Sequence, residues 1–375
     1  MKNPINNPAH LQQRLLQWFS ANRRRLPWRN ANNWYPVFLS EFLLQQTQVA
    51  QVLPYFEKLL QTYPTIQHLA AADEDLLLSQ WAGLGYYSRA RNLLKAAKAI
   101  VHRFDGKFPS NYKDALSLPG IGPYTASAIL SIAFNQPYAV VDGNIIRVIT
   151  RLFNIQEDVR AKTTQKQIRS LATVLLPKDK PGLFNEAMME LGALICRPTT
   201  PLCDQCPLQA YCLAKRHNAM HRVPFKSPPA PKKKRYHFVF LLEHNGRLLT
   251  VQRPHGGLLA RMWEFPSVET SAAEFQAKDI SSVPKDIPVS LSDASLVLPV
   301  MKHIYSHIVL QYRPVIVCTD APFAWKSDFY VQQKWLALPE ISFVALHNAH
   351  KKILRSEAFE QWWRAKMKDE NRLDE

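Results

Sequence analysis

The chain has 375 residues, and 47% of them are hydrophobic, which is enough to bury the cores of two domains. The formal net charge is +17, and all of the excess lies in residues 1–235, which hold 31 basic and 14 acidic residues. A folded region with this bias usually binds a polyanion such as DNA or RNA, although a basic charge that serves only solubility stays open. No apolar run reaches about 18 residues, so no membrane span is predicted.

Residues 1–212 are predicted to be mostly helical. Apolar residues recur at three- and four-residue spacing in the segments 36–55, 90–104, 124–134 and 144–153. Glycines and prolines separate these segments and mark the loops between them. The pattern therefore predicts a domain built from packed amphipathic helices.

A glutamate stands out in the first of these helices. Glu41 is the only acidic residue among the first 56, and Phe and Leu residues crowd around it. Burial among apolar side chains raises the pKa of a carboxyl group, and a protonated Glu41 could act as a general acid. The alternative is a surface glutamate on an amphipathic helix.

Two glycines and an aspartate follow further along the helical region. The string Leu118-Pro119-Gly120-Ile121-Gly122-Pro123-Tyr124 lies between two helical segments, and a tight hairpin there would direct backbone N–H groups at a phosphate. An ordinary helix–turn–helix connection is the alternative. Asp142 comes twenty residues after Gly122, directly before the next helix. It could cap that helix near Ile145, and the N–H groups at a helix start keep a carboxylate ionised.

Four cysteines fall within 17 residues in the pattern C-x6-C-x2-C-x5-C, and they are Cys196, Cys203, Cys206 and Cys212. We expect no secretory signal, so a metal centre is favoured over disulfides. Zinc and a [4Fe–4S] cluster are the competing occupants. Zinc sites usually show two short cysteine pairs, whereas this pattern has one, which favours the cluster.

Residues 213–235 contain eight basic residues and no acidic ones, and they end in Pro-Lys-Lys-Lys-Arg. This composition predicts an extended basic linker that buries no core. A nuclear import signal is the less favoured interpretation of its end. After Tyr236 the pattern changes to short β-branched or aromatic runs at 237–242 and 313–318, which are typical of strands. Together with a closing helix at 357–367, they predict a second, α+β domain over 236–368, followed by a tail at 369–375.

Three further strings make a family resemblance specific. They are Leu26-Pro27-Trp28-Arg29, the segment Ser40–Val49 with Leu44-Gln45-Gln46-Thr47-Gln48, and the segment Trp81–Arg91 with Gly83-Leu84-Gly85-Tyr86-Tyr87-Ser88. With the hairpin, Asp142 and the four cysteines, they occur in the order found in bacterial adenine-specific mismatch DNA glycosylases. The chain resembles this family, the MutY type of the helix–hairpin–helix glycosylase superfamily, over nearly its whole length.

The resemblance implies both the fold and the activity. The fold would be an all-helical helix–hairpin–helix glycosylase domain over 1–212 with a [4Fe–4S] loop at 196–212, then the basic linker and a Nudix-like (MutT-like) C-terminal domain. The activity would be monofunctional excision of adenine opposite 8-oxoguanine or guanine in duplex DNA, as a step of base excision repair. The adenine would be flipped from the stack. A bacterial, cytoplasmic, nucleoid-associated monomer is expected, with a sliding clamp as a candidate partner.

The resemblance also implies residue roles. Glu41 would protonate the adenine and later activate water, Asp142 would stabilise an oxocarbenium-like sugar, and Tyr124 and Asn144 would line the site. The DNA contacts fall into three groups: Trp28, Arg29 and Glu186 on the flipped adenine; Gln46, Leu84 and Tyr86 in the stack beside the opposite base; and Leu118, Gly120 and Gly122 on the backbone phosphate.

Position 124 separates the branches of the superfamily. Relatives with a lyase step carry a lysine there, which attacks the sugar as a Schiff-base nucleophile. Tyr124 therefore implies a glycosylase without a strong strand-nicking step, although Lys113 or another lysine could give weak nicking.

The C-terminal domain lacks the glutamate cluster of an active Nudix box, so pyrophosphate hydrolysis is not expected. Its string Tyr305-Ser306-His307 matches the family's loop for 8-oxoguanine, in which Ser306 would bind the modified edge and Tyr305 and His307 would support it. A turn with a purely local role is the alternative. The loop 197–202 is less basic than the family's loops often are, so its phosphate contacts would be weaker.

Three other functions stay open. A thymine mismatch glycosylase would share the helical domain but generally lacks the Nudix-like one. A Nudix hydrolase tethered to a DNA-binding module is disfavoured by the missing glutamates. A non-enzymatic damage sensor is disfavoured because Glu41 and Asp142 are both present.

Overall fold

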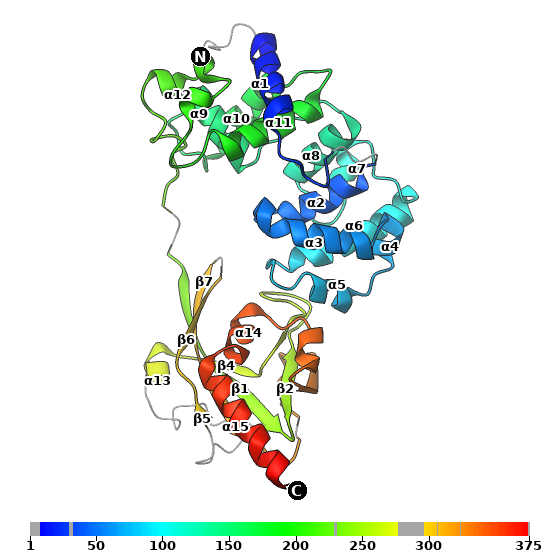
Figure 1. Ribbon diagram of the computed structural model, residues 1–375, viewed down its shortest axis with the longest axis vertical. Coiled ribbons are helices and arrows are strands. Elements are labelled where there is room, and N and C mark those ends of the chain that lie inside the picture. The colour runs from blue at the N-terminus through cyan, green and yellow to red at the C-terminus, as the bar shows by residue number, and fades with distance from the viewer. Residues whose placement is uncertain are drawn as a thin grey trace. The chain divides into compact units, whose positions relative to one another are not determined.

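The computed structural model describes residues 8–29, 33–228, 231–276, 296–305, 307–322 and 324–373. Its contacts divide the chain into two compact units. The first comprises Met1–Ala72 and Arg89–Pro229, and the second comprises Asp73–Ser88 and Ala230–Glu375. Helices build the first unit, whereas the second combines a β-sheet with helices (Figure 1).

Packing around one central helix organises the first unit. Helix α11 (Pro181–Leu194) packs against α1 (Pro8–Asn22), α8 (Pro123–Phe134) and α9 (Gly143–Leu152). The other helical elements described in this unit are α2 (Tyr35–Leu44), α3 (Val49–Thr62), α4 (Ile66–Ala70), α6 (Ser88–Phe104), α7 (Tyr112–Leu116), α10 (Lys162–Leu175), η1 (Cys203–Gln205), η2 (Gln209–Tyr211) and α12 (Leu213–Arg216).

The sequence of α9 explains how it is held. Ile145, Val148, Ile149 and Leu152 are buried and recur at the spacing that places side chains on one face of a helix. Burying each such side chain stabilises the fold by about 1.5–3 kcal/mol. This packing fixes the start of α9, where Asp142 stands at the N-cap.

Helix α2 differs from α9 because it is apolar nearly all round, and every residue from Tyr35 to Leu43 is buried.

The sequence predicts one helix over 36–55, but this prediction is wrong, since the helix is interrupted between α2 and α3. Gln46 adopts a φ of 59°, which lies outside the helical region. The buried Arg89 guanidinium donates Nη1 to the carbonyl oxygens of Leu43 at 2.7 Å and Gln45 at 2.6 Å, which satisfies the end of α2.

The second unit contains one mixed sheet among its described residues. Strand β1 (Lys233–His244) lies at its centre, parallel to β7 (Ile308–Cys318) and antiparallel to β2 (Arg247–Gln252) and β4 (Ser267–Thr270). The remaining described elements are β3 (Trp263–Glu264), β5 (Leu296–Val297), β6 (Met301–Ile304), β8 (Gln332–Ala337), α5 (Glu74–Gln80), α13 (Ala272–Gln276), η4 (Glu340–Phe343), α14 (Asn348–Leu354) and α15 (Glu357–Leu373).

The predicted linker over 213–235 needs a correction. Residues 213–216 form α12, and Ala214, Ala219 and Val223 form a small buried cluster. Strand β1 already begins at Lys233. Arg151 Nε on α9 donates to the Met220 and Val223 carbonyls and so ties this stretch to the helical unit. The high proportion of basic residues obscures this folded part in the sequence.

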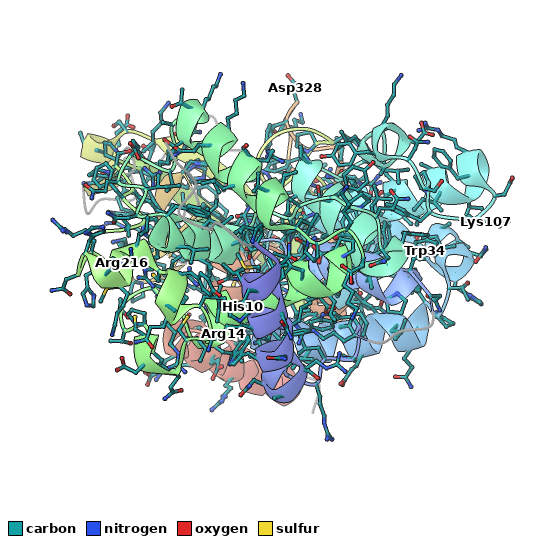
Figure 2. All side chains as sticks on the ribbon, turned by 90° about the horizontal axis from the view of Figure 1, so that it is seen from above. His10, Arg14, Trp34, Lys107, Arg216 and Asp328 are labelled. Atoms are coloured by element: carbon teal, nitrogen blue, oxygen red, sulfur yellow. The ribbon has the colours of Figure 1, made fainter. Side chains whose placement is uncertain are left out.

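The surface of the helical unit carries exposed basic side chains. Arg14 on α1, Lys107 after α6 and Arg216 at the end of α12 all lie on the outside of the molecule (Figure 2). Among the described residues, no helix is both long and apolar enough to cross a lipid bilayer.

A close approach between α8 and α11 generates a testable prediction. A Cβ atom at Gly182 would overlap the Ser131 carbonyl oxygen and lie 2.8 Å from Ile132 Cα, and neither backbone atom can move cheaply. We expect Gly182→Ala to reduce the free energy of unfolding by about 1–3 kcal/mol. At Gly143 an added Cβ meets no atom within 4 Å, so Gly143→Ala is the matched control. Thermal unfolding of the two variants checks the prediction, which equal midpoints would contradict.

Candidate functional site

Glu41 is the most unusual titratable group in the helical unit. Only 4% of the residue is exposed, and its Oε2 has no hydrogen-bond partner within the described part of the chain. Burial raises the pKa of Glu41 to about 8; the neighbouring Tyr124 hydroxyl opposes this effect, and the charges of Asp142 and Glu186 add to it. The alternative of a surface glutamate is therefore excluded, and Glu41 holds a proton at neutral pH.

Asp142 has a different environment. Its Oδ1 accepts a hydrogen bond from the Ile145 backbone N–H at 2.7 Å, and its Oδ2 accepts one from Asn144 Nδ2 at 2.9 Å. Burial raises the pKa of this carboxyl as well, but these hydrogen bonds and the Arg147 charge oppose the increase. Asp142 thus caps α9 and receives the donors that favour a carboxylate.

Tyr124 links the two carboxyl groups. It lies in the first turn of α8, and the Glu41 and Asp142 charges both act on its hydroxyl. Burial raises the pKa of Tyr124 well above its usual value, so the hydroxyl stays protonated. The Tyr124 hydroxyl also donates to Met189 Sδ, at 3.9 Å from the oxygen. Side chains from α2, α8 and α9 therefore meet at one place, as the sequence interpretation requires.

The segment before α2 contributes an ion pair. Arg29 donates Nε to Glu186 Oε1 at 2.8 Å, and the Arg29 side chain is 8% exposed. Burial raises the pKa of Glu186, and the Arg29 charge opposes the rise. Trp28 is 7% exposed and packs against Phe56, with ring centroids 5.1 Å apart. Since the Glu186 charge also acts on Glu41, this ion pair borders the same site.

The glycine hairpin takes the expected form of a tight turn before a helix. Gly120 has a φ of 76°, and Ile121 N–H donates to the Leu118 carbonyl at 3.2 Å. Gly122 caps α8 with an extended backbone, and an added Cβ there would meet no atom within 4 Å. Gln45 Nε2 reaches the Gly120 carbonyl at 3.3 Å, so the hairpin is tied to the end of α2. In general, the N–H groups at a helix start can bind a phosphate.

The residues predicted to lie beside the opposite base are Gln46, Leu84 and Tyr86. Gln46 is exposed and follows Gln45, which binds the hairpin. Leu84 is 5% exposed and Tyr86 is 46% exposed with a φ of 49°, and both belong to the segment that groups with the second unit.

The predicted 8-oxoguanine loop lies in the second unit, between β6 and β7. Tyr305 N–H donates to the Ile308 carbonyl at 2.8 Å, and His307 is exposed. The Tyr305 ring lies 4.5 Å from that of His303. Ser306 falls outside the described residues.

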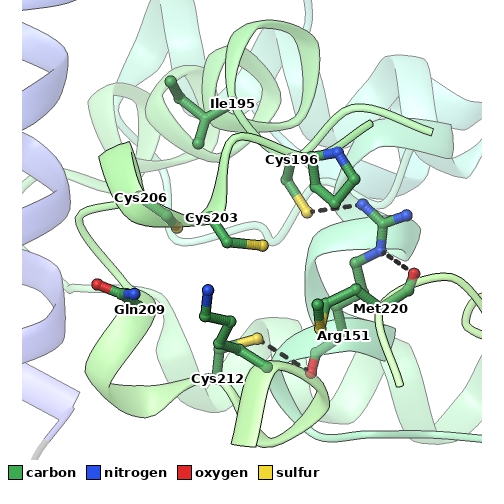
Figure 3. Close-up of a pocket in the computed structure, with 10 residues that line it drawn as sticks. Arg151, Ile195, Cys196, Cys203, Cys206, Gln209, Cys212 and Met220 are labelled. Atoms are coloured by element: carbon green, nitrogen blue, oxygen red, sulfur yellow. Dashed lines mark hydrogen bonds between the residues drawn. The ribbon is translucent and has the colours of Figure 1, made fainter. Parts of the chain in front are cut away.

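The four cysteines surround one pocket at the end of α11 (Figure 3). None forms a disulfide. Arg151 Nη1 donates to Cys196 Sγ at 3.4 Å, and Lys215 and Gln209 also line the pocket. Burial raises the pKa of the Cys206 thiol to about 12, so a bound metal would be needed to keep this sulfur as a thiolate.

Four charged residues in or beside the site were missed by the sequence analysis, and they are Arg24, Arg147, Arg151 and Glu190. Arg147 connects the carboxyl site with the cysteine pocket. It donates Nη2 to Asn144 Oδ1 at 2.8 Å and Nε to the Cys196 carbonyl at 2.7 Å. Glu190 follows Glu186 by one helical turn in an otherwise apolar helix, and that spacing was a signal available in the sequence.

Comparisons with known proteins agree with this arrangement. Residues 39–174 match the model of the HhH-GPD superfamily of base excision DNA repair proteins, and residues 237–356 match that of the NUDIX domain. The adenine DNA glycosylase of Rattus norvegicus is 33% identical over 419 residues, covering 95% of this chain and 81% of the relative. That of Buchnera aphidicola subsp. Baizongia pistaciae is 33% identical and covers 81% of this chain and 84% of the relative.

A solved structure titled a thermostable thymine-DNA glycosylase superposes with a TM-score of 0.52 at 28% identity, covering 56% of this chain and 97% of that one. The fold and the site thus define a helix–hairpin–helix base excision DNA repair protein that also carries a Nudix-like domain, which confirms the predicted fold class. Within that class, the chain belongs to the adenine DNA glycosylase family.

The raised pKa of Glu41 makes stability depend on pH in a defined direction. Between about pH 4.5 and 8 the folded state keeps a proton that the unfolded state loses, so stability is lost as pH rises through this window. Gln cannot ionise, so the free energy of unfolding of Glu41→Gln should rise relative to that of the wild type. The expected rise is about 1.4 kcal/mol for each unit by which the pH is raised within this window. Urea unfolding at pH 5 and pH 8 measures this gain. The exposed Glu157→Gln is the control, and a constant difference between Glu41→Gln and wild type would disprove the shift.

Proposed function

We propose that the protein excises adenine mispaired with 8-oxoguanine or guanine in duplex DNA. The observation that carries the proposal is a pair of carboxyl groups in contrasting environments: Glu41 holds a proton because it is desolvated, and Asp142 receives hydrogen bonds at a helix start. Cleavage of a glycosidic bond needs one acid and one anion in this arrangement. Membership of the adenine DNA glycosylase family supports adenine as the leaving base.

The chemical steps follow from these roles. Glu41 donates its proton to a ring nitrogen of the flipped adenine, and the bond between N9 and C1′ breaks with its electron pair going to the base. The Asp142 carboxylate stabilises the positive charge that develops on the sugar. Glu41, now ionised, accepts a proton from the water that attacks C1′. This returns Glu41 to its starting state and leaves an abasic site.

Specificity and strand integrity rest on other residues. Hairpin N–H groups around Gly122 would hold the phosphate beside the flipped nucleotide. The string Tyr305-Ser306-His307 would read the 8-oxoguanine, a role that rests on the family resemblance. Tyr124 provides no amine for a Schiff base, so the strand stays intact after base loss. A sliding clamp remains a candidate partner on the resemblance alone.

We also propose that Cys196, Cys203, Cys206 and Cys212 hold a [4Fe–4S] cluster. All four line one pocket, and their pattern has one short cysteine pair flanked by gaps of six and five rather than two short pairs. A mononuclear zinc site needs its sulfurs about 2.3 Å from one centre, whereas a cluster accepts more widely spaced thiolates. When bound, the cluster would cross-link the loop that follows α11.

Adenine release tests the main proposal. Under single-turnover conditions, the wild type should release adenine from a duplex with one adenine opposite 8-oxoguanine, and strand breaks should appear only after alkali. Glu41→Gln and Asp142→Asn should each reduce the rate constant by at least about 10²-fold, since each removes a group needed in the transition state.

Controls separate the alternatives. Release of thymine, but not adenine, from mismatched duplexes would show that the protein is a thymine mismatch glycosylase. Adenine release that survives both substitutions would rule out the two-carboxylate mechanism. Strand breaks without alkali would contradict the monofunctional assignment.

Metal analysis tests the cluster. Protein purified without oxygen should contain iron and acid-labile sulfide in equal amounts, because a [4Fe–4S] cluster contains as many sulfides as iron atoms. Cys203→Ser should lose most of both, whereas Cys318→Ser, at the exposed fifth cysteine, should keep them. Stoichiometric zinc without sulfide would overturn the proposal.

A further inference from the structure

Helix α11 carries two acidic residues one turn apart, but only Glu186 is among the predicted contacts of the flipped adenine. Glu190 is more deeply buried, with 1% of its side chain exposed. A buried carboxylate is costly unless it is paired, so its partners indicate what it does.

Glu190 binds two arginines of the segment between α1 and α2. Its Oε1 accepts from the Arg24 backbone N–H at 2.8 Å and from Arg24 Nε at 2.9 Å. Its Oε2 accepts from Arg24 Nη2 at 2.8 Å and from Arg29 Nη2 at 3.1 Å. Burial opposes ionisation, but these hydrogen bonds outweigh it and hold the pKa of Glu190 at about 2. Glu190 is therefore an anion throughout the physiological pH range.

The Arg29 guanidinium is consequently fixed at three points. Nη2 binds Glu190, Nη1 binds the Arg24 carbonyl oxygen at 3.0 Å, and Nε binds Glu186. Two of these three contacts depend on Glu190, because Glu190 also holds the Arg24 backbone. A planar guanidinium held at three points presents its remaining edge in one orientation.

This arrangement matters for the choice of base. Adenine presents an N6–H₂ donor beside its N7 acceptor, whereas guanine presents the acceptor O6 beside N7. The Glu186 carboxylate accepts hydrogen bonds and Arg29 donates them, so the two side chains complement an adenine edge only if both are held in place. Glu186 itself is bound through Arg29 alone among the hydrogen bonds of the described residues.

We propose that Glu190 is a positioning residue for base selection: it fixes Arg29, and Arg29 holds Glu186 in the orientation that accepts adenine and rejects guanine. The inference rests on the proposed function. Glu190 touches no reacting atom in this scheme and acts only through Arg29.

The test is a double-mutant cycle on binding. Dissociation constants are measured for the cofactor-loaded, full-length protein with two duplexes that differ only at the target position. One carries uncleavable 2′-fluoro-2′-deoxyadenosine opposite 8-oxoguanine, and the other carries 2′-fluoro-2′-deoxyguanosine. The proteins are wild type, Glu190→Gln, Arg29→Met and the double variant, with Glu157→Gln as an exposed control. Thermal midpoints are recorded for each.

We expect Glu190→Gln to reduce the preference for adenine by about tenfold in the wild-type background and by less than about twofold in the Arg29→Met background. An unchanged preference in Glu190→Gln, whatever its thermal midpoint, would overturn the inference and make Glu190 purely structural. Equal losses in both backgrounds would also overturn it, since Glu190 would then not act through Arg29. A wild type that neither prefers nor releases adenine would instead refute the proposed function.

Discussion

The desolvation of one carboxyl group is the constraint on which the rest of the site depends. Helix α2 is buried on every side, so Glu41 is shielded from bulk water and keeps its proton. A neutral acid can then stand close to Asp142 and Glu186 without the repulsion that three ionised carboxylates would suffer. The helices that surround α2 are thus part of the chemistry, because they exclude the water that would ionise Glu41.

Local sequence patterns predicted much of the site and of the secondary structure around it. The N-cap at Asp142, the hairpin around Gly120 and the clustering of four cysteines are each set within a few residues, and each has a sequence signature. The helical periodicity of α9 and the strand runs within β1 and β7 were likewise correct. In these cases the physical determinant, a cap, a turn or a repeating apolar spacing, is contained in the segment itself.

The features that were missed depend on distant partners. Arg24 and Glu190 are 166 residues apart, and nothing near either residue indicates the other. The break after α2 is fixed by Gln46 in a left-handed conformation and by Arg89, which binds carbonyl oxygens more than 40 residues away. The folded part of the predicted linker depends on contacts with Arg151 of α9 and with Val159, between α9 and α10, which its own basic composition does not reveal.

The Arg151 side chain ties the cysteine loop to the chain that follows it. Its guanidinium binds Cys196 Sγ and the Arg197 and Pro198 carbonyls on one side, and the Met220 and Val223 carbonyls on the other. One buried guanidinium therefore binds two segments at once, the cysteine loop and the chain around residues 220–223. A movement of Arg151 would break hydrogen bonds to both segments. Damage to the cysteine loop should therefore also make residues 213–228 more accessible to proteases, because the same guanidinium anchors the Met220 and Val223 carbonyls.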